Sequence, residues 1–403
     1  MNHDEPSADP SRRDFLKKSF LSLGLLLGGR HLVACGGEDG APLPPLPTST
    51  NFGALGPLGA PDANGVRLPA GFTSRILAKS GEAIGPDGTP WIGFPDGAAT
   101  FFARDGGFYY AVNSEGIVDG GVSVLRFDAS GTIVDHYPIL RKTRMNCSGG
   151  KMPWGTWMSC EEAGDGGVFE CDPTGRREAT PWPALGKFQH EAVAYDPANH
   201  HLYLTEDNTM GRFYRFRPDR LVDGHADFAS GTLEVLRILV GEEGACEWLP
   251  IADPSGSPTA TRSQQPTSTA FSGGEGVYHH EGIVYFTTKG DNRIRAYDIA
   301  NQSLTIVYDQ ATHPTGTLSG VDNVIATPFG ELVVAEDGGD MEIVAVMPNG
   351  SLVTLAQVVG HTGSEITGIA FDPTYTRLLF GSQRGTDGKG VSFMIEGPFF
   401  AFA

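Results

Sequence analysis

The chain has 403 residues and a formal net charge of −19, with 55 glycines, 28 prolines and 40% hydrophobic residues. The glycines and prolines are scattered, which predicts many turns and few long helices, and the apolar content is ample for a core. We therefore expect an all-β protein. So acidic a chain would be repelled by nucleic acid and by anionic membrane surfaces, which excludes both as partners and favours bound cations as the counter-charge.

The first residues have the pattern of an export signal. Ser11 to Lys17 contain a twin-arginine motif, and the apolar stretch from Phe20 to Gly29 is too short to span a membrane. Leu32-Val33-Ala34-Cys35 has the form of a lipobox, in which the cysteine is acylated. Residues 1–35 are thus predicted to be a Tat signal peptide with a lipobox.

This signal predicts the address and the domain organisation of the protein. We expect export by the Tat machinery to the periplasm or cell surface, with attachment to the membrane only through a lipid anchor at Cys35. Residues 36–51 are rich in Gly, Pro, Ser and Thr and are expected to form a flexible tether. Residues 52–403 are expected to form a single domain.

A short pattern, an apolar strand that runs out into polar residues, recurs along this domain. Taking one polar residue from each occurrence as equivalent, the steps are 47, 45, 84, 46 and 47 residues. The doubled step predicts an insertion around residues 241–274. The equivalent residues are Glu115, Glu162, Asp207, Asp291, Asp337 and Arg384.

Each occurrence is followed by a second alternating strand and preceded by another, so that about four short strands fall in roughly 45 residues. Such units bury their faces only by stacking on neighbours. The repeat predicts a six-bladed β-propeller, with four-stranded antiparallel blades around a metal-lined channel. A large β-sandwich with coincidental periodicity is the alternative.

Two rings of polar residues are expected at one mouth of such a channel, because the first strand of a blade starts where the second ends. The first ring is predicted to be Asp96, Cys147, Glu191, Glu275, Asp322 and Thr367, with Glu365 nearby. The second ring is predicted to contain Glu115, Cys160-Glu161-Glu162, Glu206-Asp207, Lys289 with Asp291, Glu336-Asp337 and Gln383-Arg384.

So many carboxylates in one cleft repel one another unless cations lie among them, which predicts metal binding. Carboxylate oxygens suit calcium, magnesium or manganese, whereas a thiolate such as that of Cys160 indicates a transition metal, with iron as one candidate. A solvated strand end is the alternative for any single acidic pair, and an inert buried thiol is the alternative for Cys160.

Lys289 and Arg384 are the two cations of the second ring. They could hold an anionic ester and stabilise the charge that develops during its displacement, or they could simply neutralise neighbouring carboxylates. The chain contains no nucleophile elbow, P-loop or zinc motif, which leaves hydrolysis by a metal-bound hydroxide. Cys147 could pair with Cys160 across a hairpin, and Cys171 and Cys246 could form a bridge or stay free.

These segments resemble the PhoX family of bacterial alkaline phosphatases. The resemblance runs from about Gly97 to Gly385, and its most specific block is Pro153-Trp154-Gly155-Thr156-Trp157-Met158-Ser159-Cys160-Glu161-Glu162. Further matching blocks are Asn146-Cys147-Ser148-Gly149-Gly150, His190-Glu191-Ala192, Thr205-Glu206-Asp207, Glu275-Gly276, Ala335-Glu336-Asp337-Gly338, Glu365-Ile366-Thr367-Gly368 and Ser382-Gln383-Arg384-Gly385.

The resemblance implies a six-bladed propeller with two Fe3+ and Ca2+ ions joined through an oxo group, with the cysteine of the Cys-Glu-Glu block on iron. The ligands implied for this chain are Cys160 with a subset of Glu161, Glu191, Glu206, Asp207, Glu275, Glu336, Asp337 and Glu365. Arg384 and Lys289 are the expected catalytic contacts to phosphate. Ser114 departs from the family, which usually has histidine there, and the chain is shorter than typical members.

The function predicted from the sequence is metal-dependent hydrolysis of phosphate monoesters by a metal-bound oxo or hydroxide group. One alternative is a calcium-dependent propeller hydrolase of a lactonase-like or phytase-like kind. The other is a non-catalytic surface lipoprotein that is stabilised by its metal ions.

Overall fold

The computed structural model describes residues 43–84 and 88–403. The predicted Tat signal, the lipobox with Cys35 and residues 36–42 of the predicted tether lie outside the described residues. No helix in the described part is long and apolar enough to cross a membrane. The helices of the described part are four short 3-10 helices, η2 (Phe52–Ala54), η3 (Pro183–Leu185), η4 (Thr261–Ser263) and η5 (Lys289–Asp291).

The described chain is built from antiparallel meanders of four short strands, which confirms the all-β prediction. Two sheets hold one meander each in chain order. They consist of β4 (Pro95–Phe102), β5 (Phe108–Ser114), β6 (Gly120–Phe127) and β7 (Ile133–Thr143), and of β8 (Asn146–Lys151), β9 (Trp157–Glu161), β10 (Val168–Cys171) and β11 (Thr180–Pro181).

A nine-stranded sheet combines two meanders through one shared edge strand, β18 (Gly244–Pro250), which pairs with β17 and β22. The first meander is β12 (His190–Asp196), β13 (His201–Glu206), β14 (Phe213–Pro218) and β17 (Gly231–Ile238). The second is β19 (Gly274–His280), β20 (Ile283–Thr288), β21 (Arg293–Asp298) and β22 (Ser303–Asp309). The predicted insertion therefore begins with an ordered strand, β18, and continues into the segment that leads to β19.

The N-terminal part of the domain completes the last sheets. β3 (Thr73–Lys79) pairs with β29 (Val391–Glu396) next to β28 (Arg377–Ser382) and β27 (Ile366–Phe371). β2 (Val66–Arg67) extends the sheet of β26 (Leu352–Val358), β25 (Glu342–Val346), β24 (Leu332–Glu336) and β23 (Val321–Ala326). The chain thus closes the ring by pairing its beginning with its end.

Two small two-stranded sheets complete the fold, the hairpin of β15 (Leu221–Val222) with β16 (His225–Ala226), and the pair of β1 (Ser49–Thr50) with β30 (Phe400–Ala401) from the two ends of the chain. The pairing of β1 corrects the predicted end of the tether at residue 51. Ser49 and Thr50 are already fixed to the C-terminal strand, and the Thr50 hydroxyl donates a hydrogen bond to Glu331 over 2.6 Å.

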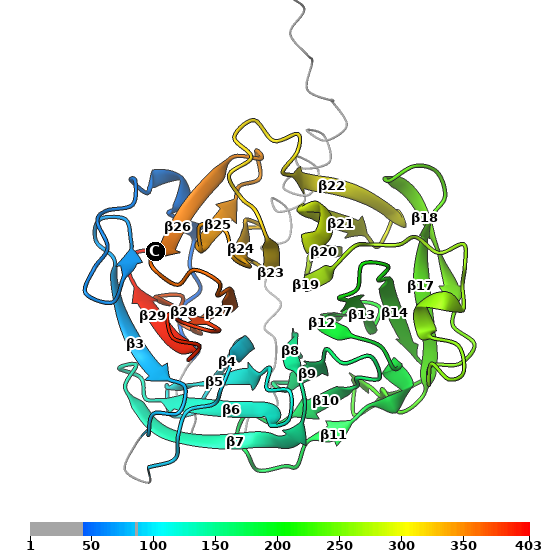
Figure 1. Ribbon diagram of the computed structural model, residues 1–403, viewed down its shortest axis with the longest axis horizontal. Coiled ribbons are helices and arrows are strands. Elements are labelled where there is room, and N and C mark those ends of the chain that lie inside the picture. The colour runs from blue at the N-terminus through cyan, green and yellow to red at the C-terminus, as the bar shows by residue number, and fades with distance from the viewer. Residues whose placement is uncertain (1–42, 85–87) are drawn as a thin grey trace, which may run out of the picture.

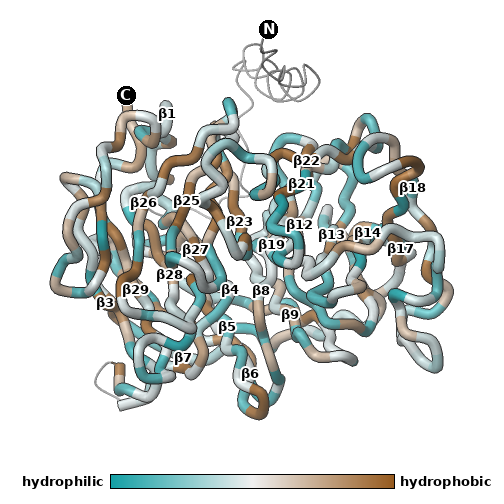
Figure 2. The backbone as a smooth tube through the Cα atoms, turned by 45° about the horizontal axis from the view of Figure 1, so that its top comes forward, coloured by the Kyte–Doolittle hydropathy of each residue, from teal (hydrophilic) through white to brown (hydrophobic). Residues whose placement is uncertain are grey.

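The meanders are arranged radially, with β4, β8, β12, β19, β23 and β27 innermost around a central opening (Figure 1). Contacts between successive inner strands run all the way round, including β27 with β4. Six clusters of buried apolar side chains lie between neighbouring meanders. Hydrophobic residues follow strands such as β23 and β29, and hydrophilic ones lie at many turns (Figure 2). The fold is a propeller-like ring that brings its inner strands to one axis.

Candidate metal centre

The register of the inner hairpins places one polar ring at the start of the first strands and a second ring at the end of the second strands. In each meander, the residue that opens the inner strand pairs with the residue that closes the next strand, and the ladder is irregular just beyond. The paired residues are Pro95 with Ser114, Asn146 with Glu161, His190 with Glu206, Gly274 with Thr288, Val321 with Glu336 and Ile366 with Ser382.

The residues that follow these pairs form the two rings. The first contains Asp96, Cys147, Glu191, Glu275, Asp322 and Thr367, as the sequence predicted, and the second contains Glu115, Glu162, Asp207, Lys289, Asp337 and Gln383. The four acids of the first ring are almost completely buried. Strand register, rather than any local motif, therefore gathers these side chains.

Four groups of side chains at this mouth have ligand atoms within 4.8 Å of one another and could hold metal ions. Their members come from every meander around the axis, so the sites depend on the closed ring. The groups are Glu115 with Cys147 and Glu162; Asp96 with Glu115 and Glu365; Glu191 with Glu275 and Asp322; and Asp322 with Asp337 and Glu365.

The electrostatics of these groups call for cations. Burial first, and then mutual repulsion, raises the pKa of Asp96, Glu191 and Asp322 well above the ordinary values. The Oε2 atom of Glu191 is buried without a hydrogen-bond partner. Such carboxylates must bind protons or positive ions, and the donor set of oxygen atoms with one thiol fits metal ions.

The thiol of this mouth belongs to Cys147, which corrects the prediction of Cys160 as a ligand. The Cys147 Sγ atom lies 3.2 Å from Glu191 Oε1, and burial followed by the charges of Asp96 and Glu191 raises its thiol pKa well above the ordinary value. Cys160 is fully buried in β9 within the apolar cluster that contains Met158. Side chains alternate along a strand, so Cys160 faces the packing between sheets.

Asp207 was a predicted ligand that belongs to none of the four groups, although it lies at the mouth, 4.0 Å from Lys289. Glu161, Glu206 and Glu336 were also predicted ligands and belong to none of the groups. All three close a second strand, and each accepts a hydrogen bond from the backbone N–H of the residue six positions on, over 3.1 Å: Gly167, Arg212 and Glu342. Glu161 and Glu336 also accept backbone N–H groups of Arg144 and Ser319. These carboxylates fasten loops, and their acidic neighbours Glu162, Asp207 and Asp337 face the mouth instead.

Ser114, the position at which this chain departs from the family pattern, occupies the same place as these loop-fastening acids. Its hydroxyl donates a hydrogen bond to the Gly93 carbonyl over 2.7 Å, and its side chain is buried. The neighbouring Glu115 reaches the mouth, where it belongs to two of the four groups. The departure thus changes a loop contact and leaves the ring of ligand atoms complete.

Lys289 lies among carboxylates on one side of the mouth. Its Nζ atom is 3.0 Å from Glu275 Oε1, 2.9 Å from Asp337 Oδ2 and 4.0 Å from Asp207 Oδ2. The carboxylates outweigh the desolvation of the amine and raise the pKa of Lys289 above its ordinary value. Three of the predicted site residues, Asp207, Glu275 and Asp337, are therefore held together by a fourth.

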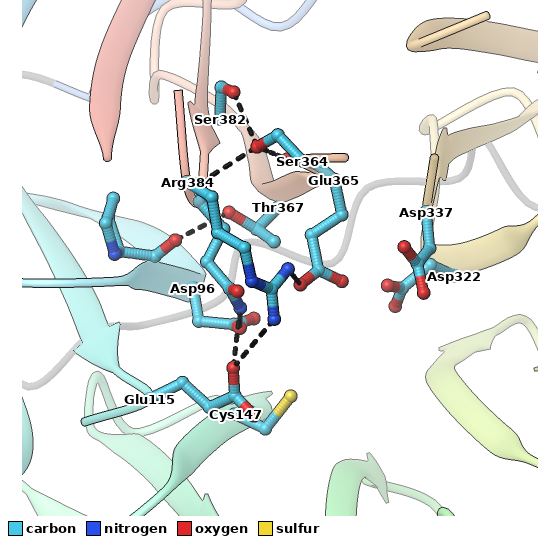
Figure 3. Close-up of polar contacts among 12 residues, drawn as sticks. Asp96, Glu115, Cys147, Asp322, Asp337, Ser364, Glu365, Thr367, Ser382 and Arg384 are labelled. Carbon is cyan, nitrogen blue, oxygen red and sulfur yellow. Dashed lines mark hydrogen bonds and ion pairs between the residues drawn. The ribbon is translucent and has the colours of Figure 1, made fainter. Parts of the chain in front are cut away.

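Arg384 lies on the other side, between Glu115 and Glu365 (Figure 3). Its guanidinium is 2.6 Å from Glu365 Oε1 and 3.7 Å from Glu115 Oε2, and 42% of its side chain is exposed. Gln383 donates hydrogen bonds to Asp96 and to Glu115, the latter over 2.8 Å. Figure 3 shows Asp322 and Asp337 close together across the mouth from this pair. Both predicted catalytic cations thus line the mouth and remain reachable from solvent.

The predicted insertion contributes one arginine to the edge of the site. Arg262 Nε donates to Glu206 Oε1 over 2.7 Å, while Tyr214 and the Arg212 backbone satisfy the other carboxylate oxygen. Arg262 thus donates to Glu206 the hydrogen bond that Glu161 and Glu336 each receive from a backbone N–H. The hydroxyl of Thr261 in η4 bonds to the Lys187 carbonyl over 2.9 Å, which fixes the same segment.

The ring members missing from the ligands implied by the resemblance are Asp96, Glu115, Cys147, Glu162 and Asp322. The repeat in the sequence already placed all five in the two predicted rings, because each occupies the same position in its meander. Cys147, Cys160, Cys171 and Cys246 are free in the described part of the chain, so the structure contains neither of the disulfides that the sequence left open.

Fold and site together define an all-β, propeller-like protein with a carboxylate-lined mouth. The family model "Alkaline phosphatase PhoX" matches residues 129–167 and 163–303. Among solved structures, Pseudomonas fluorescens PhoX in complex with vanadate, a transition state analogue, has a TM-score of 0.73 at 15% identity, covering 90% of this chain and 99% of that chain. The predicted resemblance to the PhoX family is thereby confirmed.

A structural genomics protein of unknown function from Bacteroides thetaiotaomicron is also similar in fold. Its TM-score is 0.51 at 9% identity, and the match covers 81% of this chain and 76% of that chain. No curated protein sequence matches the chain.

Proposed function

We propose that the protein is a metal-dependent phosphatase that hydrolyses phosphate monoesters. The observation that carries this proposal is the mouth itself, in which two rings of acids, a thiol and two solvent-reachable cations converge. The match to alkaline phosphatase PhoX and the fold shared with a PhoX bound to vanadate, a transition state analogue, support the same chemistry.

The residues present fit metal ions of two kinds. Cys147 with Glu115 and Glu162 would hold a transition metal, with Fe3+ as the proposed ion, because a thiol ligand disfavours a site for calcium alone. The carboxylate-only groups around Asp322 would hold Ca2+. When bound, such ions would polarise phosphoryl oxygens and lower the pKa of a water molecule.

The two cations of the chain would position the ester. Arg384 offers a planar guanidinium suited to two phosphoryl oxygens, and its position beside Glu115 and Glu365 brings a bound phosphate to the centre of the mouth. Lys289 would carry a point charge on the opposite side, beside Asp337. Both cations favour the developing negative charge of the displaced phosphoryl group.

We propose that the ring has six blades, counting the nine-stranded sheet as two. This count is supported by the cyclic order of the six apolar clusters, each between two neighbouring meanders. We also propose that the protein is exported by the Tat machinery and carries a lipid anchor at Cys35. The twin arginines Arg12 and Arg13 support this export route. A cell in which Cys35→Ser still yields membrane-bound, lipid-labelled protein would contradict the anchor.

The proposal is tested by assaying phosphate release from p-nitrophenyl phosphate and from bis-p-nitrophenyl phosphate. We expect the monoester to be the better substrate, vanadate to inhibit, and Arg384→Gln to raise KM. Arg237→Gln is a matched control, because Arg237 pairs with Glu247 on the sheet of β17 and β18, away from the mouth. Equal loss of activity in Arg384→Gln and Arg237→Gln would contradict the role assigned to Arg384. A preference for the diester would contradict the assignment as a monoesterase.

A further inference from the structure

The central opening contains a second lined space at the ends of the inner strands remote from the acidic mouth. A cavity of about 580 Å³ is lined by the far halves of β4, β8, β12, β19, β23 and β27. Asp96 lies at the mouth end of β4, and Phe101 lines the cavity five residues further on, about 17 Å along an extended strand. The cavity therefore extends from residues next to the first ring, such as Ser148 and Gly276, to the other end of the channel, where Phe101 and Lys151 lie.

The lining combines apolar and aromatic side chains with several polar ones, among them Thr100, Asn323 and Asp372. Small residues such as Ala98 and Gly149 bring the strands close to the axis, and aromatic rings surround the space, among them Phe101, Tyr278 and Phe371. Cavities of this volume with apolar walls and few polar groups are the usual form of a small-molecule site.

One cation faces this cavity without an acidic partner. Lys151 closes β8, is exposed to the cavity, and donates a hydrogen bond to the Thr100 carbonyl over 2.8 Å. Its ammonium lies 5.2 Å from the centre of the Phe101 ring. Among the described residues, no carboxylate forms an ion pair with Lys151. Although the side chain as a whole is exposed, its ammonium lies between the Thr100 carbonyl and the Phe101 ring, and burial of the amine there lowers the pKa of Lys151 to about 8.

The other ionisable groups of the lining are already satisfied. Asp372 accepts hydrogen bonds from Thr374 and from Arg377, which also forms an ion pair with it over 3.2 Å. His279 lies 3.6 Å from Asp196, and its burial lowers the pKa of the imidazole. Burial raises the pKa of Tyr278 to about 12, so this phenol stays neutral. Lys151 is thus the one group of the lining whose charge lacks a counter-ion.

We propose that this end of the channel is a second binding site, for a small organic monoanion with an apolar body, whose carboxylate pairs with Lys151. A single amine matches one negative charge, whereas a phosphate dianion would need further cations that the lining does not provide. The aromatic walls match a planar apolar body, which would displace water from Phe101 and Phe371. The proposal does not depend on the phosphatase assignment.

Isothermal titration calorimetry with benzoate on the full-length, metal-loaded protein tests this site. We expect benzoate to bind at least tenfold more tightly than acetate, which lacks the ring, and than benzyl alcohol, which lacks the charge. Lys151→Met should weaken benzoate binding at least tenfold, and Lys151→Arg should keep it within about threefold. Lys79→Met, on the exposed outer strand β3, is the matched control and should leave binding unchanged.

Binding to the native protein should also weaken between pH 7 and pH 9, as the Lys151 amine loses its proton, and should not weaken in Lys151→Arg. Thermal unfolding of each variant shows whether it is folded. Benzoate binding that survives in a folded Lys151→Met, or equal affinity for acetate and benzoate, would overturn the proposal. Phosphate release that is unchanged in Lys151→Met would leave the phosphatase assignment intact in either case.

Discussion

Adjacent acidic residues at this mouth have different tasks. In Glu161-Glu162, Glu206-Asp207 and Glu336-Asp337, the first acid turns away and accepts backbone N–H groups. Of the second acids, Glu162 and Asp337 belong to the groups that could hold metal ions, and Asp207 lies beside Lys289. The division follows from strand alternation, since neighbouring side chains point to opposite sides. Replacing the first acid should therefore damage stability, and replacing the second should damage ion binding.

The pair Glu336 and Asp337 allows this division to be measured within one strand end. Glu336→Gln places an amide N–H₂ against a backbone N–H of Ser319 or Glu342, and should cost about 1–3 kcal/mol of unfolding free energy. Asp337→Asn removes the partly exposed ion pair with Lys289, so it should cost the metal-free protein less than about 1 kcal/mol of unfolding free energy. It should also lower the metal content of the loaded protein. Chemical denaturation and elemental analysis of both variants provide the check, and a reversed pattern would refute the division.

The two cysteines near the Cys-Glu-Glu block give a second comparison. Cys147→Ala should reduce bound transition metal and lower kcat/KM by at least about 100-fold, because a direct ligand is lost. Cys160→Ala removes a buried apolar contact and should cost about 1–2 kcal/mol of stability with metal content retained. Normal metal content in Cys147→Ala would show that the thiol is no ligand.

At this scale the sequence predicted both rings but misassigned members within them. Glu161 and Glu162 look equivalent in the sequence, and only the register that pairs Asn146 with Glu161 shows which one reaches the axis. Ser114, Thr288 and Ser382 occupy the position in their meanders that Glu161 occupies in its own. Because a hydroxyl residue stands there in three meanders, the sequence already indicated that this position lies outside the ligand ring.

Among the elements, the insertion between β18 and β19 is the one that connects the periphery with the metal centre. Arg262 forms an ion pair with the fully buried Glu206 over 2.6 Å, next to Asp207 of the second ring. The corresponding carboxylates of two other meanders, Glu161 and Glu336, accept a backbone N–H at this place instead, from Arg144 and Ser319. The insertion therefore supplies the partner of Glu206 Oε1 through Arg262.

Replacing Arg262 should show how much the stability of the protein depends on its contact with Glu206. Arg262→Gln leaves the buried Glu206 carboxylate without its cation, and we expect a loss of about 3 kcal/mol, at the low end for a broken buried pair because Arg262 is partly exposed. Arg237→Gln, which breaks the more exposed pair with Glu247, should cost less than about 1 kcal/mol. Similar losses in both variants would show that Arg262 is only a surface contact.

The repeated strands could be predicted because each is a short apolar run between turns, from the segment at Tyr109 to that at Leu378. The pairing of β1 with β30 and of β3 with β29 could not, because it joins the two ends of the chain and leaves no local pattern. The contact of Arg262 with Glu206 spans 56 residues and was equally hidden.

For the whole molecule, the acidic mouth makes stability depend on pH when metal ions are removed. Burial, and then the charges of Asp207 and Glu115, raises the pKa of Glu162 to about 8, and burial similarly raises those of Asp96, Glu191 and Asp322. Above the unfolded pKa, near 4, the native state holds more protons than the unfolded state. The unfolding free energy must then fall as pH rises.

We accordingly expect the chelated protein to lose about 1 kcal/mol or more of stability relative to the metal-loaded protein between pH 7 and pH 9, from Glu162 alone. Lys151 and the histidines whose pKa burial lowers, such as His190 and His201, contribute in the opposite direction, but they do so in both forms, so their contributions cancel in this comparison. Metal-loaded protein should lack this loss, because bound cations favour the ionised carboxylates. Thermal unfolding of both forms at the two pH values measures this difference, and a chelated protein that loses no stability relative to the metal-loaded protein at pH 9 would contradict the role of Glu162.

The central claim is that this mouth is a metal-dependent phosphatase site. Its most direct test is to measure iron and calcium content together with phosphate release from p-nitrophenyl phosphate, on one sample of protein purified after native export. We expect both metals and turnover, with turnover lost on chelation and restored when the metals are returned. Protein fully loaded with both metals that releases no phosphate from any monoester would contradict this claim.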